Sequence, residues 1–197
     1  MSRPRLILAS TSPYRSELLA RLGLPFETMA PGIDERAHDA EDAVSLTQRL
    51  AREKAQHAAG QTDRADAVII AADQSAALGA TILGKPGDFA AALAQLEACQ
   101  GRSVHFYTAT TIVDCGSGSA WHDVDTTEAR FRSRTTEQLS RYLEREQPYD
   151  CAGGFKVEGL GITLFEAVES RDPTALVGLP LIWLTGVLRE LGLDPLL

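Results

Sequence analysis

The sequence predicts one α/β domain over residues 1–197, with helices flanking a mixed β-sheet. Short continuous apolar runs, at Leu6–Ala9 and Val68–Ala72, are typical of buried strands. Two longer strand-like segments joined by Gly-Ser-Gly-Ser at 116–119 indicate a hairpin. Helical segments lie between both kinds of strand. A chain of 197 residues is long enough for one such domain with a sizeable core.

The first predicted elements are a strand at Leu6–Ala9 and a helix that begins at Pro13. Ser12 suits the N-cap of this helix, and proline suits its first position. Gly23 is a natural residue just past the helix end. We then expect a link or short strand at residues 25–31, followed by a loop at residues 32–35.

An alanine-rich segment, residues 42–59, predicts the second helix, and one of its faces carries a lysine. Positions four apart share a face of a helix, and here they are Leu46, Leu50, Lys54 and Ala58. One interpretation is that Lys54 extends its charged end to water. The other is that this face ends at a pocket into which Lys54 points.

The remaining elements follow from apolar patterning, turn residues and caps. The buried strand at 68–72 ends just before Asp73 and Gln74. We expect, in order, a hairpin or loop at 75–86, a helix at 89–99, strands at 103–114 and 120–133, a helix opened by the capping box Thr135–Gln138, a glycine-rich loop at 153–161, a strand at 162–168 and a helix at 181–191.

Composition excludes several classes of protein. The net charge is −8, and a partner such as DNA or RNA needs a basic surface, so we expect no nucleic-acid polymer as partner. A small nucleotide needs only a few local cations. We identify no signal peptide and no membrane-spanning run, and therefore expect no membrane partner and a cytoplasmic location.

The cysteines predict no disulfide framework and no zinc site, because Cys99, Cys115 and Cys151 form no C-x-x-C pair and are odd in number. Cys151 remains a candidate nucleophile. No histidine follows it in the chain to serve as its base, which makes this role the weaker alternative.

The stretch Ser10-Thr-Ser-Pro-Tyr-Arg15 joins the first strand to the first helix and carries polar groups suited to an anion. A helix N-terminus supplies backbone N–H donors and a positive dipole, and Arg15 adds a planar fork of donors. The same hydroxyl residues can instead serve only to cap the helix, so both interpretations stay open.

Several charged residues could complete a site for chemistry on phosphate. Asp73 follows a buried strand, where ligand sites often form in α/β sheets. Asp34 and Glu35 lie in a proline-bounded loop, and Lys85 lies in a turn. Together with Arg15 and Lys54, these residues form the minimum set for metal-assisted attack on a phosphate ester, provided that they converge.

The chain resembles a known family, the Maf nucleotide pyrophosphatases, over essentially its full length. Several ordered motifs at compatible spacing carry the resemblance: Leu-Ala-Ser-Thr-Ser-Pro-Tyr-Arg-Ser-Glu-Leu-Leu (8–19), Pro-Gly-Ile-Asp-Glu (31–35), Ala-Arg-Glu-Lys-Ala (51–55), Ala-Asp-Gln (72–74), Leu-Gly-Lys-Pro (83–86) and Val-Gly-Leu-Pro (177–180).

The resemblance implies an elongated mixed sheet with an active-site cleft, shared with inosine triphosphatase-like proteins, and hydrolysis of nucleoside triphosphates to monophosphate and pyrophosphate. It implies a divalent cation, Mg²⁺ or Mn²⁺, and allows a homodimer. Asp73 matches the general base and, with Glu35, the metal ligands. The positions that match phosphate contacts are Ser10, Arg15, Lys54 and Lys85.

The resemblance also points to a substrate, through three positions. Tyr14, Gln74 and Glu158 differ from the arginine, small hydroxyl residue and glutamine of the branch that acts on dTTP and UTP. They are similar to the 7-methyl-GTP branch, in which tryptophan is the residue expected where Tyr14 stands. A dTTP, UTP or broader pyrophosphatase is the alternative, and a nucleotide-binding regulator of cell division is the alternative of another class.

Overall fold

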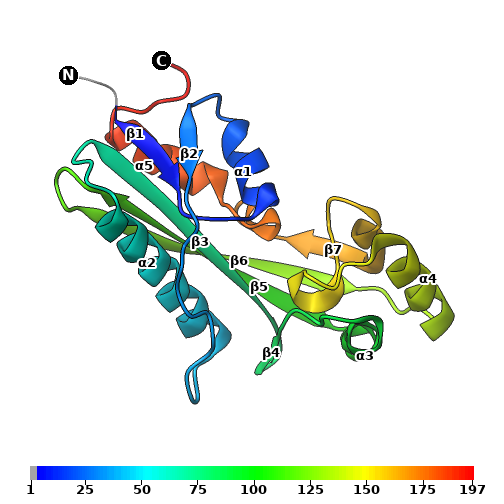
Figure 1. Ribbon diagram of the computed structural model, residues 1–197. Coiled ribbons are helices and arrows are strands. Elements are labelled where there is room, and N and C mark those ends of the chain that lie inside the picture. The colour runs from blue at the N-terminus through cyan, green and yellow to red at the C-terminus, as the bar shows by residue number, and fades with distance from the viewer. Residues whose placement is uncertain (1–3) are drawn as a thin grey trace. The chain divides into compact units, whose positions relative to one another are not determined.

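The computed structural model describes residues 4–197 (Figure 1). These residues divide into two compact units. The first unit comprises the chain up to Asp73, Thr108–Asp125 and Asp172–Leu197. The second comprises Gln74–Tyr107 and Thr126–Arg171. Each unit is therefore built from separate stretches of sequence. The prediction that residues 1–197 form one domain stays a prediction.

The strands form a mixed sheet in the order β2-β1-β3-β5-β6-β7, and β4 pairs with β3. β1 pairs in parallel with both β2 and β3, whereas the β3–β4 and β6–β7 pairs are antiparallel. This confirms the predicted mixed sheet. The strands are β1 (Arg5–Leu8), β2 (Phe26–Thr28), β3 (Ala67–Leu78), β4 (Thr81–Leu83), β5 (Ser103–Asp114), β6 (Ala120–Phe131) and β7 (Phe165–Glu169).

In the first unit, helices cover both faces of β1 and β3. Side chains alternate across a strand, so Leu6 and Leu8 pack with α1 (Pro13–Ala20) and α5 (Leu181–Glu190), whereas Ile7 packs with α2 (Ala43–Gln61). Figure 1 shows α2 on one side of these strands and α1 and α5 on the other. A strand buried on both faces must be apolar throughout, as the run at 6–9 is.

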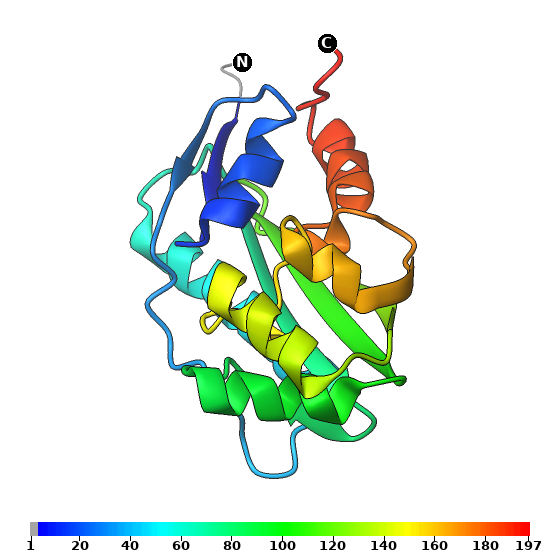
Figure 2. The same ribbon diagram turned by 90° about the vertical axis from the view of Figure 1, so that its right-hand side faces the viewer.

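In the second unit, two helices lie side by side, α3 (Phe89–Cys99) and α4 (Thr136–Glu146) (Figure 2). The predicted capping box at Thr135 is present. Phe155 and Phe165 pack edge-to-face with ring centroids 4.8 Å apart, and Phe106 and Phe131 join this cluster. Short 3₁₀ helices complete the chain: η1 (Ala152–Gly154) and η2 (Leu160–Leu164) here, and η3 (Ala175–Val177) in the first unit.

Two predicted strand boundaries are wrong. The strand predicted to end at Ala72 continues to Leu78, so Asp73 and Gln74 lie within β3 and not at its end. The run Ala71–Ala77 is buried except for the partly buried Gln74, and its polar residues are not typical of a buried strand, so the sequence does not reveal the continuation. The strand predicted from residue 162 starts at Phe165, because η2 occupies the preceding residues. No helix among residues 4–197 has the length and apolarity to span a membrane.

Candidate active site

The junction between β1 and α1 is both a helix cap and a turn stabilised by hydroxyl groups. Ser12 Oγ accepts from the backbone N–H of Arg15, which confirms Ser12 as N-cap. Ser10, 5% exposed, accepts from the backbone N–H of Ser12 at 3.1 Å. The side chain of Ser10 therefore shapes the turn that begins α1, and it lies at the helix end where an anion would be attracted.

Arg15 extends from the first turn of α1 and is held by the backbone of a distant segment. Its Nε donates to the carbonyl oxygen of Gly178 at 3.0 Å. Burial lowers the pKa of Arg15, and the negative charges of Asp73 and Glu35 partly offset that effect. Arg15 therefore belongs to the same electrostatic cluster as these two acids.

Lys54 is buried, with 3% of its surface exposed, and does not extend to water. Its Nζ lies 2.7 Å from Asp73 Oδ1 and 2.8 Å from Glu35 Oε1. The buried face of α2 carries Leu46, Leu50 and Ala58 as well, as the i+4 spacing predicted. The interpretation in which Lys54 extends its charged end to water is therefore wrong, and its ammonium instead pairs with two carboxylates. That this face ends at a pocket stays a prediction.

Asp73 reaches Lys54 because of its register in β3. Ile69 and Ala71 belong to the cluster that packs against α2. Alternation along a strand places Asp73, two residues on, on the same face. Its side chain is only 10% exposed, and a carboxylate this buried needs a charged or hydrogen-bonding partner. Lys54 supplies both.

Glu35 lies in the loop between β2 and α2, and Arg49 fixes that loop against the helix. Arg49 donates to the carbonyl oxygen of Arg36 at 3.0 Å and pairs with Glu41 at 2.8 Å. Asp34 instead binds Arg36, which lowers the pKa of Asp34 to about 2. Of the neighbouring acids Asp34 and Glu35, Glu35 is the one that reaches Lys54.

Asp73 and Glu35 are the residues of this cluster able to hold a divalent cation. Within residues 4–197, no group of three or more histidine, cysteine, aspartate or glutamate side chains is arranged for a metal ion. Mg²⁺ commonly takes one or two carboxylates and completes its shell with water and substrate phosphates. Two carboxylates gathered around one ammonium group fit that kind of site, and they do not fit a metal cage made of protein alone.

Three predicted site residues belong to the second unit. Gln74 lies within β3, Lys85 is exposed after β4, and Glu158 is exposed in the turn before η2. Tyr14, at the start of α1, belongs to the first unit and is partly buried. The first-unit cluster thus contains Arg15, Glu35, Lys54 and Asp73, with Ser10 at the neighbouring helix end.

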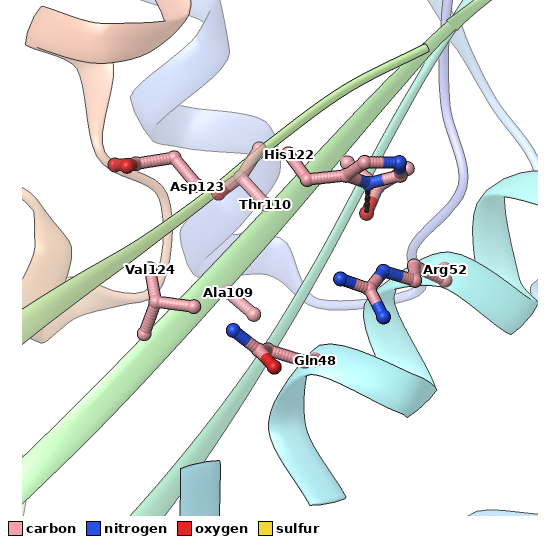
Figure 3. A pocket seen from close by; sticks show the side chains of 8 residues that line it. Gln48, Arg52, Ala109, Thr110, His122, Asp123 and Val124 are labelled. Atoms are coloured by element: carbon pink, nitrogen blue, oxygen red, sulfur yellow. Dashed lines mark hydrogen bonds between the residues drawn. The ribbon is translucent and has the colours of Figure 1, made fainter. Parts of the chain in front are cut away.

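A separate pocket of about 300 Å³ lies between α2, β5 and β6 (Figure 3). Arg52 and Gln48 line it from the helix, and Thr111 Oγ1 lies 3.0 Å from His122 Nδ1 across the strands. Burial, and then the charge of Arg52, lower the pKa of His122. None of the residues predicted for the site lines this pocket.

Cys151 does not have the environment of a nucleophile. Burial, and then the charge of Asp150, raise its pKa to about 12, so the thiol stays protonated at neutral pH. Only a thiolate is an effective nucleophile. This finding disfavours Cys151 as the nucleophile.

The residues that sequence reasoning missed are those that hold the cluster in place. Arg49 and Gly178 act through contacts with other segments of the chain, and no local pattern in the sequence reveals those contacts. The motif Val-Gly-Leu-Pro at 177–180 contributes to the family resemblance, but the sequence predicts no role in the site for it.

The site combines Lys54 and Arg15 with two carboxylates, near the N-terminal end of α1. Sites of this class are suited to phosphate groups. The comparisons with known proteins identify the family. The family described as Maf-like protein matches residues 5–191. The chain therefore belongs to the Maf family.

Curated relatives are similar over nearly the whole chain. A 7-methyl-GTP pyrophosphatase of Nitrosococcus oceani is 49% identical, over 96% of this chain and 94% of that protein. A protein of the same name from Ralstonia nicotianae is 52% identical, over 95% of this chain and 96% of that protein. Another from Xanthomonas oryzae pv. oryzae is 51% identical, over 96% of this chain and 97% of that protein. Among solved structures, the Staphylococcus aureus Ham1 protein overlaps at a TM-score of 0.45 with 12% identity, over 64% of this chain and 71% of that one.

Proposed function

We propose that this protein is a metal-dependent pyrophosphatase that hydrolyses 7-methyl-GTP to 7-methyl-GMP and pyrophosphate, and so removes a modified nucleotide from the cell. The observation that carries this proposal is the buried Lys54 between Asp73 and Glu35. The name shared by the curated relatives supports the choice of substrate. We assign the same reaction to the cytoplasm, where nucleotides are found.

The triphosphate would be bound by cations and by the end of α1. Arg15 offers a planar fork of donors suited to two phosphate oxygens. Lys54 is a compact charge that can leave one carboxylate for a phosphate oxygen. Ser10 and the backbone N–H groups at the helix start would complete this part. Lys85 is the remaining phosphate contact that we propose.

Asp73 would take the proton of the attacking water. Its Oδ1 binds Lys54, so Oδ2 is the oxygen we assign to the proton. Glu35 and Asp73 would hold the Mg²⁺ or Mn²⁺ ion. When bound, that cation would neutralise charge on the phosphate oxygens and help to generate the nucleophile. Arg15 and Lys54 would stabilise the charge that develops as the α–β bond breaks.

The base would be recognised by Tyr14, Gln74 and Glu158. Methylation at N7 makes guanine cationic, and a cationic ring is attracted to the face of an aromatic side chain. The Glu158 carboxylate can accept hydrogen bonds from guanine N1–H and N2–H₂ together, whereas uracil and thymine have one ring donor there. Gln74 would contact the same edge.

The reaction type is tested by product analysis in water enriched in ¹⁸O. The proposal predicts pyrophosphate and 7-methyl-GMP, with ¹⁸O in the monophosphate, because water attacks the α-phosphorus. EDTA should abolish turnover, and added Mg²⁺ or Mn²⁺ should restore it. Release of orthophosphate with a nucleoside diphosphate, or full activity in EDTA, would contradict the proposal.

One observation favours a second candidate function. Tyrosine attracts a cation less strongly than tryptophan does, and the chain carries Tyr14 where the resemblance leads to tryptophan. A pyrophosphatase with broader selectivity, including dTTP or UTP, is therefore the alternative. Rates measured on these nucleotides beside 7-methyl-GTP separate the two.

A further inference from the structure

The segment from Asp172 to Ile182 determines where Arg15 is held. An arginine side chain has several rotatable bonds, so it needs an external contact to stay in one conformation. That contact is the Gly178 carbonyl oxygen, 3.0 Å from Arg15 Nε. Since Nε is occupied by this bond, the two terminal nitrogens are the ones left for an anion.

Asp172 ties the two ends of this segment together. It is 1% exposed. Its Oδ1 accepts from the backbone N–H of Thr174 at 2.8 Å and lies 2.6 Å from the Thr174 hydroxyl. Its Oδ2 accepts from the backbone N–H of Ile182 at 2.6 Å, in the first turn of α5. Pro180, the N-cap residue, offers no side-chain acceptor, so the carboxylate does the capping from eight residues upstream.

The contacts of Asp172 continue toward Gly178. Thr174 Oγ1 accepts from the backbone N–H of Leu181 at 2.9 Å and lies 2.9 Å from the carbonyl oxygen of Leu179. Leu179 directly follows Gly178, and Leu181 lies three residues after Gly178. The carboxylate therefore fixes the residues on the C-terminal side of the carbonyl that holds Arg15.

A second set of bonds fixes the N-terminal side. The backbone N–H of Gly178 donates to the Ala175 carbonyl oxygen at 2.9 Å, and Thr108 Oγ1 donates to that oxygen at 2.9 Å as well. Gly178 has φ +120°, and a Cβ at this position would lie 3.3 Å from Arg15 Nε. Arg15 and the segment are therefore packed together tightly.

We propose that Asp172 is a positioning residue, which acts through Thr174 and Gly178 to aim the Arg15 guanidinium at the substrate phosphates. The inference rests on the proposed function, in which Arg15 binds the triphosphate. Asp172 touches no substrate atom in this scheme. Replacing it changes the orientation of Arg15 and leaves the number of cations unchanged.

The kinetic test is a double-mutant cycle with Asp172→Asn and Arg15→Ala. Asparagine keeps the size of the side chain but has one acceptor oxygen where aspartate has two. We expect kcat/KM to fall about 10- to 100-fold for Asp172→Asn, as for a weakened charge-assisted hydrogen bond. In the Arg15→Ala background the same change should cost less than about twofold, because residues that act as a unit are not additive. Equal losses in both backgrounds would overturn the proposal.

A second readout does not depend on activity. In ¹⁵N-labelled protein, the Arg15 Nε–H should exchange slowly with water in the wild type, and about tenfold or more faster in Asp172→Asn, because the hydrogen bond to Gly178 opens more often. Asp194→Asn is the matched control, since Asp194 accepts from the backbone N–H of Leu196, beyond the C-terminal end of α5, and should leave this exchange unchanged. Unchanged exchange in Asp172→Asn would overturn the inference even in a protein without pyrophosphatase activity.

Discussion

Lys54 and Asp73 form a buried ion pair, with Nζ 2.7 Å from Oδ1. The same ammonium lies 2.8 Å from Glu35 Oε1, so one positive charge neutralises two carboxylates. The Asp73 side chain is 10% exposed and that of Glu35 is 50% exposed, so the need for a compensating charge is greatest at Asp73. The Lys54 ammonium therefore offsets the charge of both acids, and under the proposed function a bound metal ion would add a second positive charge beside them.

Lys54→Gln should make the stability of the protein depend on metal. Removing the ammonium leaves the buried Asp73 carboxylate uncompensated, a loss of about 3 kcal/mol for a buried pair. Mn²⁺ should then raise the melting temperature more in Lys54→Gln than in the wild type, because the ion restores the missing charge. Differential scanning calorimetry with and without Mn²⁺ measures this.

The control for this experiment is Arg52→Gln, which removes an exposed cation from the same helix. Its response to Mn²⁺ should equal that of the wild type. If Mn²⁺ stabilises the wild type more than Lys54→Gln, the two carboxylates do not form the metal site.

Asp73→Asn should remove the base without unfolding the protein. The amide oxygen can still accept from Lys54, but the amide cannot take a proton from water. We expect kcat to fall about 100- to 10,000-fold, the usual contribution of a general base. Pyrophosphate release measures this, with the melting temperature followed in parallel. Asp66→Asn, an exposed change just before β3, is the control, and a loss below tenfold in Asp73→Asn would exclude it as the base.

Glu158→Gln should shift the preference toward pyrimidine nucleotides. The change replaces an acceptor of two guanine donors by an amide that both donates and accepts. A site built for hydrogen bonds rejects a substrate that leaves them unpaired. The ratio of kcat/KM for 7-methyl-GTP to that for UTP should therefore fall at least tenfold. A ratio that stays constant would show that Glu158 does not recognise the base.

Acid should weaken the loop that carries Glu35, through Glu41. The hydrogen bond from Arg49 lowers the pKa of Glu41 to about 2, below its ordinary value. A carboxyl group with a lowered folded-state pKa stabilises the protein above the unfolded-state pKa, near 4.5, and loses that contribution as pH falls toward 2. The melting temperature should therefore fall over this range, and by less in Glu41→Gln. Glu144→Gln, an exposed change on α4, should keep the wild-type slope.

The parts of the site that could be predicted from sequence are those that follow from periodicity and capping. The i+4 spacing placed Lys54 on the buried face of α2, and Ser12 and Pro13 marked the start of α1. The mixed sheet followed from apolar runs and one hairpin. Local patterns of this kind act over a few residues, and they are the most reliable signals in a single sequence.

The parts that could not be predicted depend on contacts between distant segments. Asp73 and Gln74 were expected beyond a strand end, because polar residues usually end a buried strand. The ion pair with Lys54, 19 residues away, is what allows a carboxylate within β3. The bond from Arg15 to Gly178 spans 163 residues, and neither partner has a local pattern that reveals it.

The most direct test of the proposed function is the comparison of kcat/KM for 7-methyl-GTP, GTP, dTTP and UTP with Mg²⁺ present. A carboxylate that binds the guanine edge and a tyrosine that stacks on the cationic ring predict the highest value for 7-methyl-GTP, with GTP below it and the pyrimidines lowest. Because 7-methyl-GTP and GTP differ only in the methyl group and its charge, the difference between their kcat/KM values measures the contribution of Tyr14. A higher value for dTTP or UTP than for 7-methyl-GTP would contradict the account.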